Sequence, residues 1–148
     1  MVLVACLADA VFAGEDIAIC GASQGHGYYP AAGLAGIQQK TGEWHDDAIV
    51  AGNFTLTKIS ENDFDLLVSD ATGRVTSAKQ EGATLNLFGA LGDNGVSVIV
   101  NYGNVVETYT FFRNVEGKAE AMWTSNKGGG ALIMKVGVYR ADCSFFAY

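Results

Sequence analysis

The sequence is poor in several residue types on which recognisable sites depend. It has two histidines, a single proline and nine lysines and arginines against 16 aspartates and glutamates, for a net charge of −7. The positive residues are scattered singly, so no basic stripe is available to neutralise a nucleic acid or an anionic membrane surface. No segment reaches the roughly 18 apolar residues of a membrane span. We therefore expect no nucleic-acid partner and no transmembrane span.

Spacings typical of metal ligands are missing as well. The three cysteines stand at positions 6, 20 and 143, with no C-x-x-C pair, and no two histidines stand three to five residues apart. The run Glu43-Trp44-His45-Asp46-Asp47 contains ligand types, but neighbouring side chains of an extended chain diverge and cannot converge on one ion. We expect this run to be a solvated loop anchored by Trp44, and we expect no metal and no cofactor.

Glycine, β-branched residues and aromatic residues are abundant. From residue 48 onwards apolar and polar side chains alternate between turn signals such as Asp70–Gly73, Asp93–Gly95 and Glu116–Gly117. A period of two with short connections predicts an all-β fold, an antiparallel up-and-down meander of six to eight strands closed as a barrel or folded as a sandwich, lipocalin-like in outline. The expected strands cover residues 52–59, 63–70, 74–78, 84–88, 96–101, 105–113, 119–124 and 132–138.

The preceding segment is harder to assign. Asp16–Cys20 reads as a short strand, Gly21–Gly27 as a flexible glycine-rich loop, and the chain from there to Asp47 as a loop packed on the core. The β core is thus predicted to be residues 48–143. The loop from Gly21 to Asp47 is where we expect function to reside.

Residues 1–13 look like the end of a secretory signal, with an apolar stretch before Val11-Phe12-Ala13. The run lacks a basic start and is interrupted by Asp9. We predict a signal-peptide remnant at 1–13, a single domain at 14–148, and export to the periplasm or the extracellular space. If residues 1–13 belong to the fold instead, the protein is cytoplasmic. Leu3–Cys6 also matches a lipobox, with Cys6 as the lipidated residue.

Removal of residues 1–13 leaves Cys20 and Cys143. An even pair in an exported chain predicts one disulfide, and the ends of a compact domain are often close together. In a reducing compartment the two residues would be buried free thiols instead.

One motif suggests catalysis. Gly21-Ala22-Ser23-Gln24-Gly25 fits the G-x-S-x-G nucleophile elbow, for which His45 and Asp46 could supply the base and the acid. That elbow belongs to a strand-to-helix turn of a parallel sheet, which this sequence does not predict. A small serine hydrolase is therefore an alternative only.

The aromatic residues suggest binding. Inward-facing rings of a barrel either line a ligand cavity or fill the core. The candidates for ligand contact are Tyr28, Tyr29, Trp44 and Trp123.

The stretch from Cys20 to Pro30 (CGASQGHGYYP), with Phe64-Asp65, Asp70–Arg74 and Cys143, resembles a group of small exported proteobacterial proteins of unknown function. They carry a C-G-A-S-x-G-x-x-Y-Y motif near the mature N-terminus. The resemblance covers most of the mature chain and implies export and the Cys20–Cys143 disulfide, but no activity. Exported lysozyme-inhibitor barrels are similar in size and β-content, but their S-G-x-x-Y loop is not evident here.

Our leading hypothesis is a non-enzymatic, monomeric binding or protein-interaction domain of the bacterial cell envelope, with an unknown protein or small-molecule partner. The alternatives are a β-barrel carrier of a small apolar ligand and the serine hydrolase. A solid, filled barrel interior would argue against the carrier.

Overall fold

The computed structural model describes residues 14–31, 42–50, 52–128, 130 and 133–148. Every regular element in these ranges is a β-strand, ten in all. The described residues therefore contain no helix long and apolar enough to cross a membrane. The strands are β1 (Glu15–Tyr29), β2 (Glu43–Ile49), β3 (Asn53–Ser60), β4 (Asp63–Ser69), β5 (Val75–Ser77), β6 (Thr84–Ala90), β7 (Gly95–Asn101), β8 (Val105–Arg113), β9 (Ala119–Lys127) and β10 (Lys135–Phe146).

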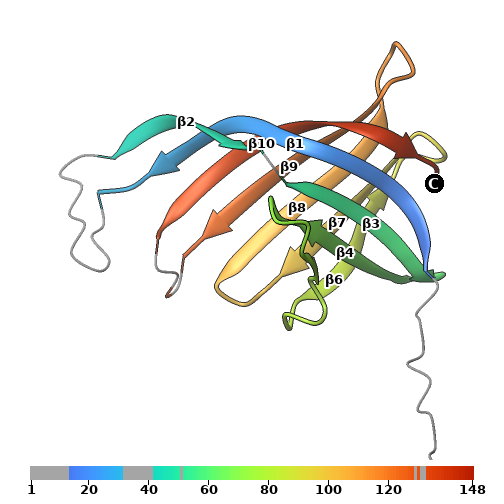
Figure 1. The fold of residues 1–148 in the computed structure, drawn as a ribbon, viewed down its shortest axis with the longest axis horizontal. Coiled ribbons are helices and arrows are strands. Elements are labelled where there is room, and N and C mark those ends of the chain that lie inside the picture. Colours follow the sequence, from blue (N-terminus) through green and yellow to red (C-terminus); the bar gives the residue numbers. More distant parts are fainter. Residues whose placement is uncertain (1–13, 32–41, 51, 129, 131–132) are drawn as a thin grey trace, which may run out of the picture.

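The strands form one antiparallel sheet curled into a half-barrel (Figure 1). Their order is β5-β4-β3-β1-β10-β9-β8-β7-β6, and β2 also pairs with β1. From β3 onwards each strand lies beside its neighbour in the chain, except that β5 and β6 do not pair. The N-terminal and C-terminal strands, β1 and β10, lie side by side in the middle of the sheet. The predicted antiparallel meander is confirmed. The strand order ends at β5 and β6, and β2 is a further edge strand because it pairs with β1 alone.

The seam between β5 and β6 follows from the shortness of β5. Its last residue, Ser77, donates its hydroxyl to the buried carboxylate of Asp65 at 2.5 Å. The chain then leaves the sheet through a turn in which Gly82 has a φ of 88°, a conformation that favours glycine. β6 begins two residues later, so the chain crosses the seam without pairing its two edge strands.

The predicted loops at Gly21–Gly27 and Glu43–Asp47 are wrong. Both segments are strands, paired from Ser23 opposite Ile49 to Tyr29 opposite Glu43. The glycines reflect close packing rather than a turn. A Cβ at Gly25 would stand 2.8 Å from the Tyr139 ring, and one at Gly27 would stand 3.1 Å from the Tyr29 ring. The β core therefore begins at Glu15 and not at residue 48.

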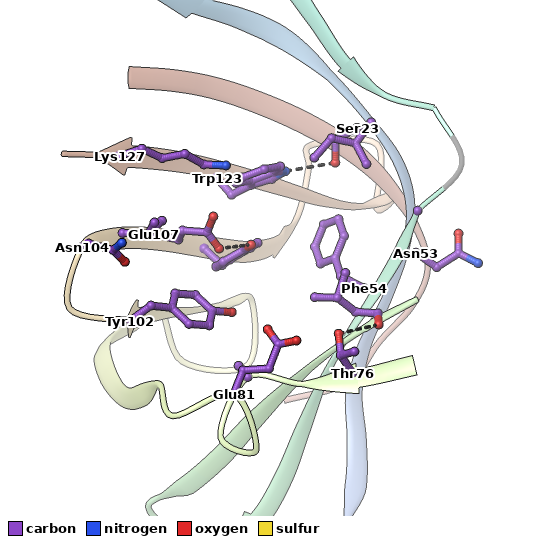
Figure 2. Close-up of a pocket in the computed structure, with 16 residues that line it drawn as sticks. Ser23, Asn53, Phe54, Thr76, Glu81, Tyr102, Asn104, Glu107, Trp123 and Lys127 are labelled. Carbon is purple, nitrogen blue, oxygen red and sulfur yellow. Dashed lines mark hydrogen bonds between the residues drawn. The ribbon is translucent and has the colours of Figure 1, made fainter. Parts of the chain in front are cut away.

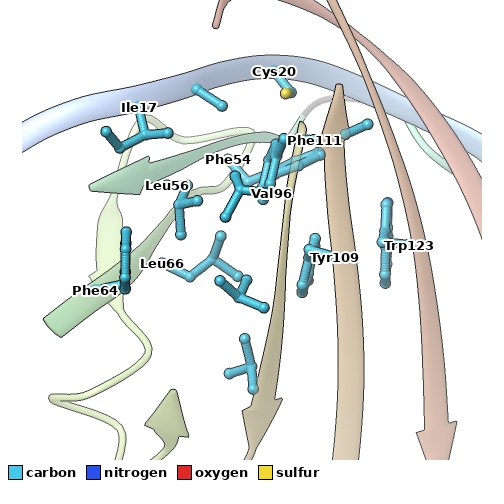
Figure 3. Packing of buried hydrophobic residues seen from close by; sticks show 14 of the residues in the cluster. Ile17, Cys20, Phe54, Leu56, Phe64, Leu66, Val96, Tyr109, Phe111 and Trp123 are labelled. Atoms are coloured by element: carbon cyan, nitrogen blue, oxygen red, sulfur yellow. The ribbon is translucent and has the colours of Figure 1, made fainter. Parts of the chain in front are cut away.

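The hydrophobic core lies inside the curl, where β1, β3 and β4 face β7, β8 and β9 (Figure 3). Alternate residues point inwards, as the period of two predicts: Phe54 and Leu56 on β3, Phe64 and Leu66 on β4. The largest fully buried side chains are Phe64, Phe111, Phe146, Leu56, Leu66, Val96, Val98 and Val100.

The predicted turns are present. Gly73 closes the β4–β5 turn at a φ of 80°, and Gly117 closes the β8–β9 turn at 77°. The turn signal at Asp93–Gly95 falls at the connection between β6 and β7. This connection runs from Leu91 to Asn94 and has Gly92 at a φ of 57°.

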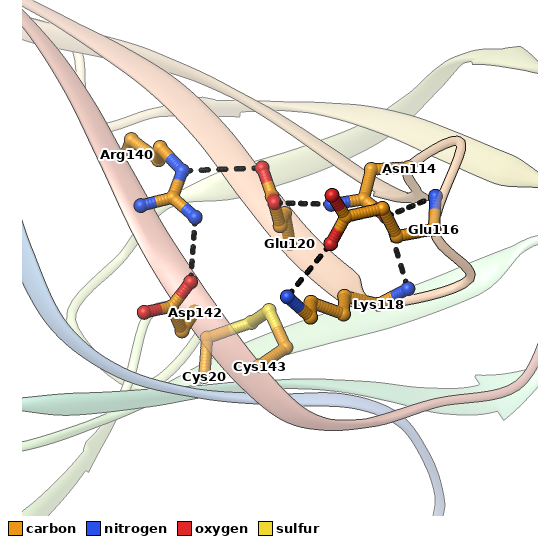
Figure 4. A network of polar contacts seen from close by, with 8 residues as sticks. All are labelled: Cys20, Asn114, Glu116, Lys118, Glu120, Arg140, Asp142 and Cys143. Atoms are coloured by element: carbon orange, nitrogen blue, oxygen red, sulfur yellow. Dashed lines mark hydrogen bonds and ion pairs between the residues drawn. A yellow bond between two sulfur atoms is a disulfide. The ribbon is translucent and has the colours of Figure 1, made fainter.

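Cys20 and Cys143 lie opposite each other in the β1–β10 ladder and form the predicted disulfide. Beside it, Arg140 joins Glu120 at 3.1 Å and Asp142 at 2.6 Å, and Asn114 donates to the same Glu120 at 2.6 Å (Figure 4). The bridge and this network bind the β8–β9 turn, β10 and β1 together. The predicted signal remnant at 1–13 and the lipidation site at position 6 lie outside the described residues.

Candidate functional site: a cavity on the concave face

The strand register arranges the inward side chains of β8, β9, β10, β1 and β2 in rows that cross the sheet. The first row is apolar or small, the second is largely aromatic and the third is largely polar. In strand order the first row is Phe111, Ala121, Ala141, Ser23 and Ile49; the second is Tyr109, Trp123, Tyr139, Gly25 and Asp47; the third is Glu107, Ser125, Gly137, Gly27 and His45. The concave face thus changes from apolar to polar along its length.

The aromatic row is a stack of rings. Trp123 lies between Tyr139, at 4.1 Å between ring centroids, and Tyr109, at 5.2 Å, with interplanar angles of 20° and 12°. Phe54 of β3 closes on Tyr109 from across the core at 5.6 Å. Because the neighbours cover both faces of the Trp123 ring, the ring edges are what border the interior.

A cavity of about 440 Å³ lies against this stack. Such a volume falls within the range of small-molecule sites, so the interior of the half-barrel is not solidly filled. Figure 2 shows Glu107, Tyr102 and Glu81 pointing into the cavity, with Phe54 facing them and Trp123 and Ser23 above. The lining residues are Ser23, Ile49, Gly52, Asn53, Phe54, Val68, Thr76, Ala78, Glu81, Tyr102, Asn104, Val105, Glu107, Tyr109, Trp123 and Lys127.

The Glu107 carboxylate is held in place from both sides. Its Oε2 accepts the Tyr109 hydroxyl at 2.8 Å, and its Oε1 accepts the Ser125 hydroxyl at 3.1 Å. Burial, together with the nearby charge of Glu107, raises the pKa of Tyr109 well above its ordinary value. Burial and the charges of Glu107 and Glu81 raise the pKa of Tyr102 to about 12. Both phenols therefore stay protonated beside the carboxylates.

A second polar cluster joins β2 to β10 across β1. Asp47 accepts hydrogen bonds from Lys135, from the Tyr139 hydroxyl at 2.7 Å and from the Tyr29 hydroxyl at 3.3 Å. Burial alone would raise the pKa of Asp47, but the hydrogen bonds from Lys135 and Tyr139 outweigh it, and the pKa is lowered. Burial would likewise lower the pKa of Lys135, but its bond to Asp47 raises it. Both groups stay charged, so the cluster is a clamp that holds β2 to β10 through an ion pair and hydrogen bonds.

The residues of the hydrolase hypothesis are not brought together. Ser23 lies within β1, buried, where its Oγ accepts the Trp123 indole N–H at 3.0 Å. It pairs with Ile49, whereas His45 pairs with Gly27, four residues or roughly 13 Å further along the strand. Asp46 contacts His26 at 3.0 Å. Nor do the described residues bring together three histidine, cysteine, aspartate or glutamate side chains able to hold a metal.

Of the four aromatic candidates, only Trp123 lines the cavity. Tyr29 belongs to the Asp47 cluster. The rings of Tyr28 and Trp44 contact each other on the outer side of β1 and β2, with 5.5 Å between their centroids, and 63% of Trp44 is exposed. The sequence did contain a signal for Glu107, since in Val105–Arg113 it stands in phase with the inward residues Tyr109 and Phe111. A carboxylate on the apolar phase of a strand marks a buried polar site.

No protein-family model, curated protein or solved structure matches this chain.

Proposed function

We propose that this chain is a non-enzymatic binding domain that holds a small molecule in the concave cavity of its half-barrel. The observation that carries the proposal is the cavity of about 440 Å³, which is bordered by aromatic rings and entered by an anchored carboxylate. Apolar walls with a few oriented polar groups are the usual composition of a small-molecule site. The hydroxyl of Ser23 is already engaged by Trp123, which favours binding over nucleophilic chemistry.

We further propose that the domain works as a monomer in the bacterial cell envelope. The Cys20–Cys143 disulfide supports this location, because disulfides persist in oxidising compartments and are rare in the cytosol. The signal-like segment at residues 1–13 and the resemblance of the CGASQGHGYYP stretch point the same way.

The binding proposal can be tested with the protein's own tryptophan. The chain has two tryptophans, and Trp44 is exposed and remote from the cavity, so Trp44→Phe leaves Trp123 as the reporter. Small molecules that shift its fluorescence are then titrated by calorimetry into two variants. Val105→Phe places bulk in the cavity, and Val106→Phe places the same bulk on the opposite face of β8.

We expect Val105→Phe to weaken binding by about tenfold or more, since it removes volume a ligand needs. Val106→Phe should bind as the parent protein does. Equal affinity in the two variants would contradict a ligand site in this cavity. A screen in which no small molecule shifts the Trp123 fluorescence would contradict it as well.

A further inference from the structure

We infer that the ligand of this cavity is a small organic cation, a protonated amine on an apolar body, and not an anion. This inference rests on the proposed function and specifies its ligand class.

The first argument is the spare acceptor capacity of Glu107. An ionised carboxylate offers about four lone-pair sites. The hydroxyls of Tyr109 and Ser125 occupy one on each oxygen and also fix the group's orientation. Both partners are neutral, so the negative charge has not been cancelled by an ion pair with them. The carboxylate thus points into the cavity, ready to accept from a cationic donor.

The second argument is a second carboxylate at the same space. Glu81 comes from the turn where the chain crosses the seam between β5 and β6, and it enters the cavity from the side of Tyr102 (Figure 2). Among the described residues that line the cavity, Lys127 is the one cation. Two acids against one base leave the lining with a net negative charge.

The third argument is the response of a group inside this field. The pKa of Tyr102 is raised to about 12 by burial and by Glu107, Glu81 and Asp65. Burial by itself disfavours a charge of either sign, but the contribution of the three carboxylates opposes an anion and favours a cation. A fatty acid or another carboxylate ligand would meet the two carboxylates that line this cavity.

The rest of the cavity suits an apolar body. The rings of Phe54, Tyr109 and Trp123 border it together with side chains such as Val68 and Val105. The ammonium group would lie at Glu107, and the apolar part would lie against these rings. Hydrogen bonds between charged partners are shorter and stronger than neutral ones, so the amine would set the orientation of the ligand.

The test compares three ligands of one shape, phenylpropylamine, phenylpropanol and phenylpropionate, titrated into the full chain by calorimetry. We expect the amine to bind about tenfold more tightly than the alcohol, and the carboxylate to bind least. Glu107→Gln should reduce amine affinity about tenfold while changing alcohol affinity less than about twofold. Glu81→Gln should also reduce amine affinity. Because Glu81 lies on an exposed turn, this variant leaves the hydrogen bonds of Glu107 within the fold intact.

Glu116→Gln is the matched control, because Glu116 lies in the β8–β9 turn outside this cavity, and it should leave all three affinities unchanged. Equal binding of the three ligands, or preference for the carboxylate, would overturn the cation inference. If the ligands that bind the parent protein in this way fail to bind Val105→Phe, the cavity remains a ligand site. No binding of the amine to the parent protein also overturns the inference, and the fluorescence screen then decides the proposed function separately.

Discussion

At the scale of single residues, two carboxylates of the concave face differ in what surrounds them. Asp47 receives hydrogen bonds from Lys135, Tyr139 and Tyr29, and its charge is balanced by the ammonium group of Lys135. Glu107 receives two neutral hydroxyls. The Asp47 carboxylate is thus occupied by interactions within the fold, whereas the Glu107 carboxylate keeps acceptor sites for a ligand.

Asp47→Asn should therefore destabilise the protein at neutral pH by about 1–3 kcal/mol, since a hydrogen-bonded charge is lost from the clamp between β2 and β10. The folded-state pKa of Asp47 lies below its ordinary value of 3.8. A lowered carboxyl pKa stabilises the fold above the ordinary value, and this stabilisation disappears as pH falls through the lowered pKa. Denaturant unfolding near neutral pH and in acid should show the difference between parent and variant shrinking in acid.

The neighbouring Asp46 supplies the control. Its side chain is 95% exposed and contacts only the surface side chain of His26 among the polar contacts described. Asp46→Asn should leave the unfolding midpoint unchanged at both pH values. An equal loss in the two variants would mean that the clamp contributes no specific stability.

At the scale of elements, β1 is the strand that organises the molecule. It pairs with β10 on one side and with β2 and β3 on the other, so it must be long enough to carry two strands along one edge. Glycine at positions 25 and 27 leaves its inner surface bare, and the rings of Tyr139 and Tyr29 cover it. A glycine-rich run is a weak strand former by itself, but rings lying across it restore the lost packing.

Gly25→Ala should destabilise the fold by about 1–3 kcal/mol, the usual cost of overpacking. The added Cβ would collide with the carbonyl of Val138 and the ring of Tyr139, neither of which is free to move. Thermal unfolding monitored by circular dichroism measures the effect. Gly89→Ala on β6 is the matched control, because nothing lies within 4 Å of its Cβ position, and it should be neutral or slightly stabilising. Similar melting temperatures for both variants would contradict close packing at Gly25.

At the scale of the whole molecule, the first and last strands are joined in the middle of the sheet, and the sheet is open between β5 and β6, which lie near the middle of the sequence. β1 and β10 form the central pair, and the Cys20–Cys143 bridge crosses them. The seam between β5 and β6 leaves two edges, with β4 and β6 in contact across it. The half-barrel is therefore covalently fixed opposite its opening.

The double variant Cys20→Ala/Cys143→Ala should lose about 2–5 kcal/mol of unfolding free energy. The bridge joins residues 123 apart in sequence, and the chain-entropy description assigns about 5 kcal/mol to so long a loop. Denaturant unfolding of the parent with and without reductant should reproduce most of the loss. The double variant should be insensitive to reductant, and a parent whose stability is equally insensitive would show that the bridge does not constrain the unfolded chain.

The sequence by itself determined the class of fold, most strand positions and the disulfide. The alternation of Phe54 and Leu56, or of Tyr109 and Phe111, is a local property of strands with one buried face, and turn glycines such as Gly73 and Gly117 mark where strands end. Even Glu107 could be found this way, by its phase on β8.

Only the tertiary structure decided that Gly21–Gly27 is a strand, that the sheet stays open at β5 and β6, and that a cavity forms. Each depends on residues far apart in sequence. Tyr139 covers Gly25 from the neighbouring strand, and the hydrogen bond between Trp123 and Ser23 joins residues 100 apart in sequence. Glu81 and Glu107 line one cavity only because the sheet curls. A local pattern reports which side of a strand is buried. What that side faces is fixed by curvature and register, which belong to the whole sheet.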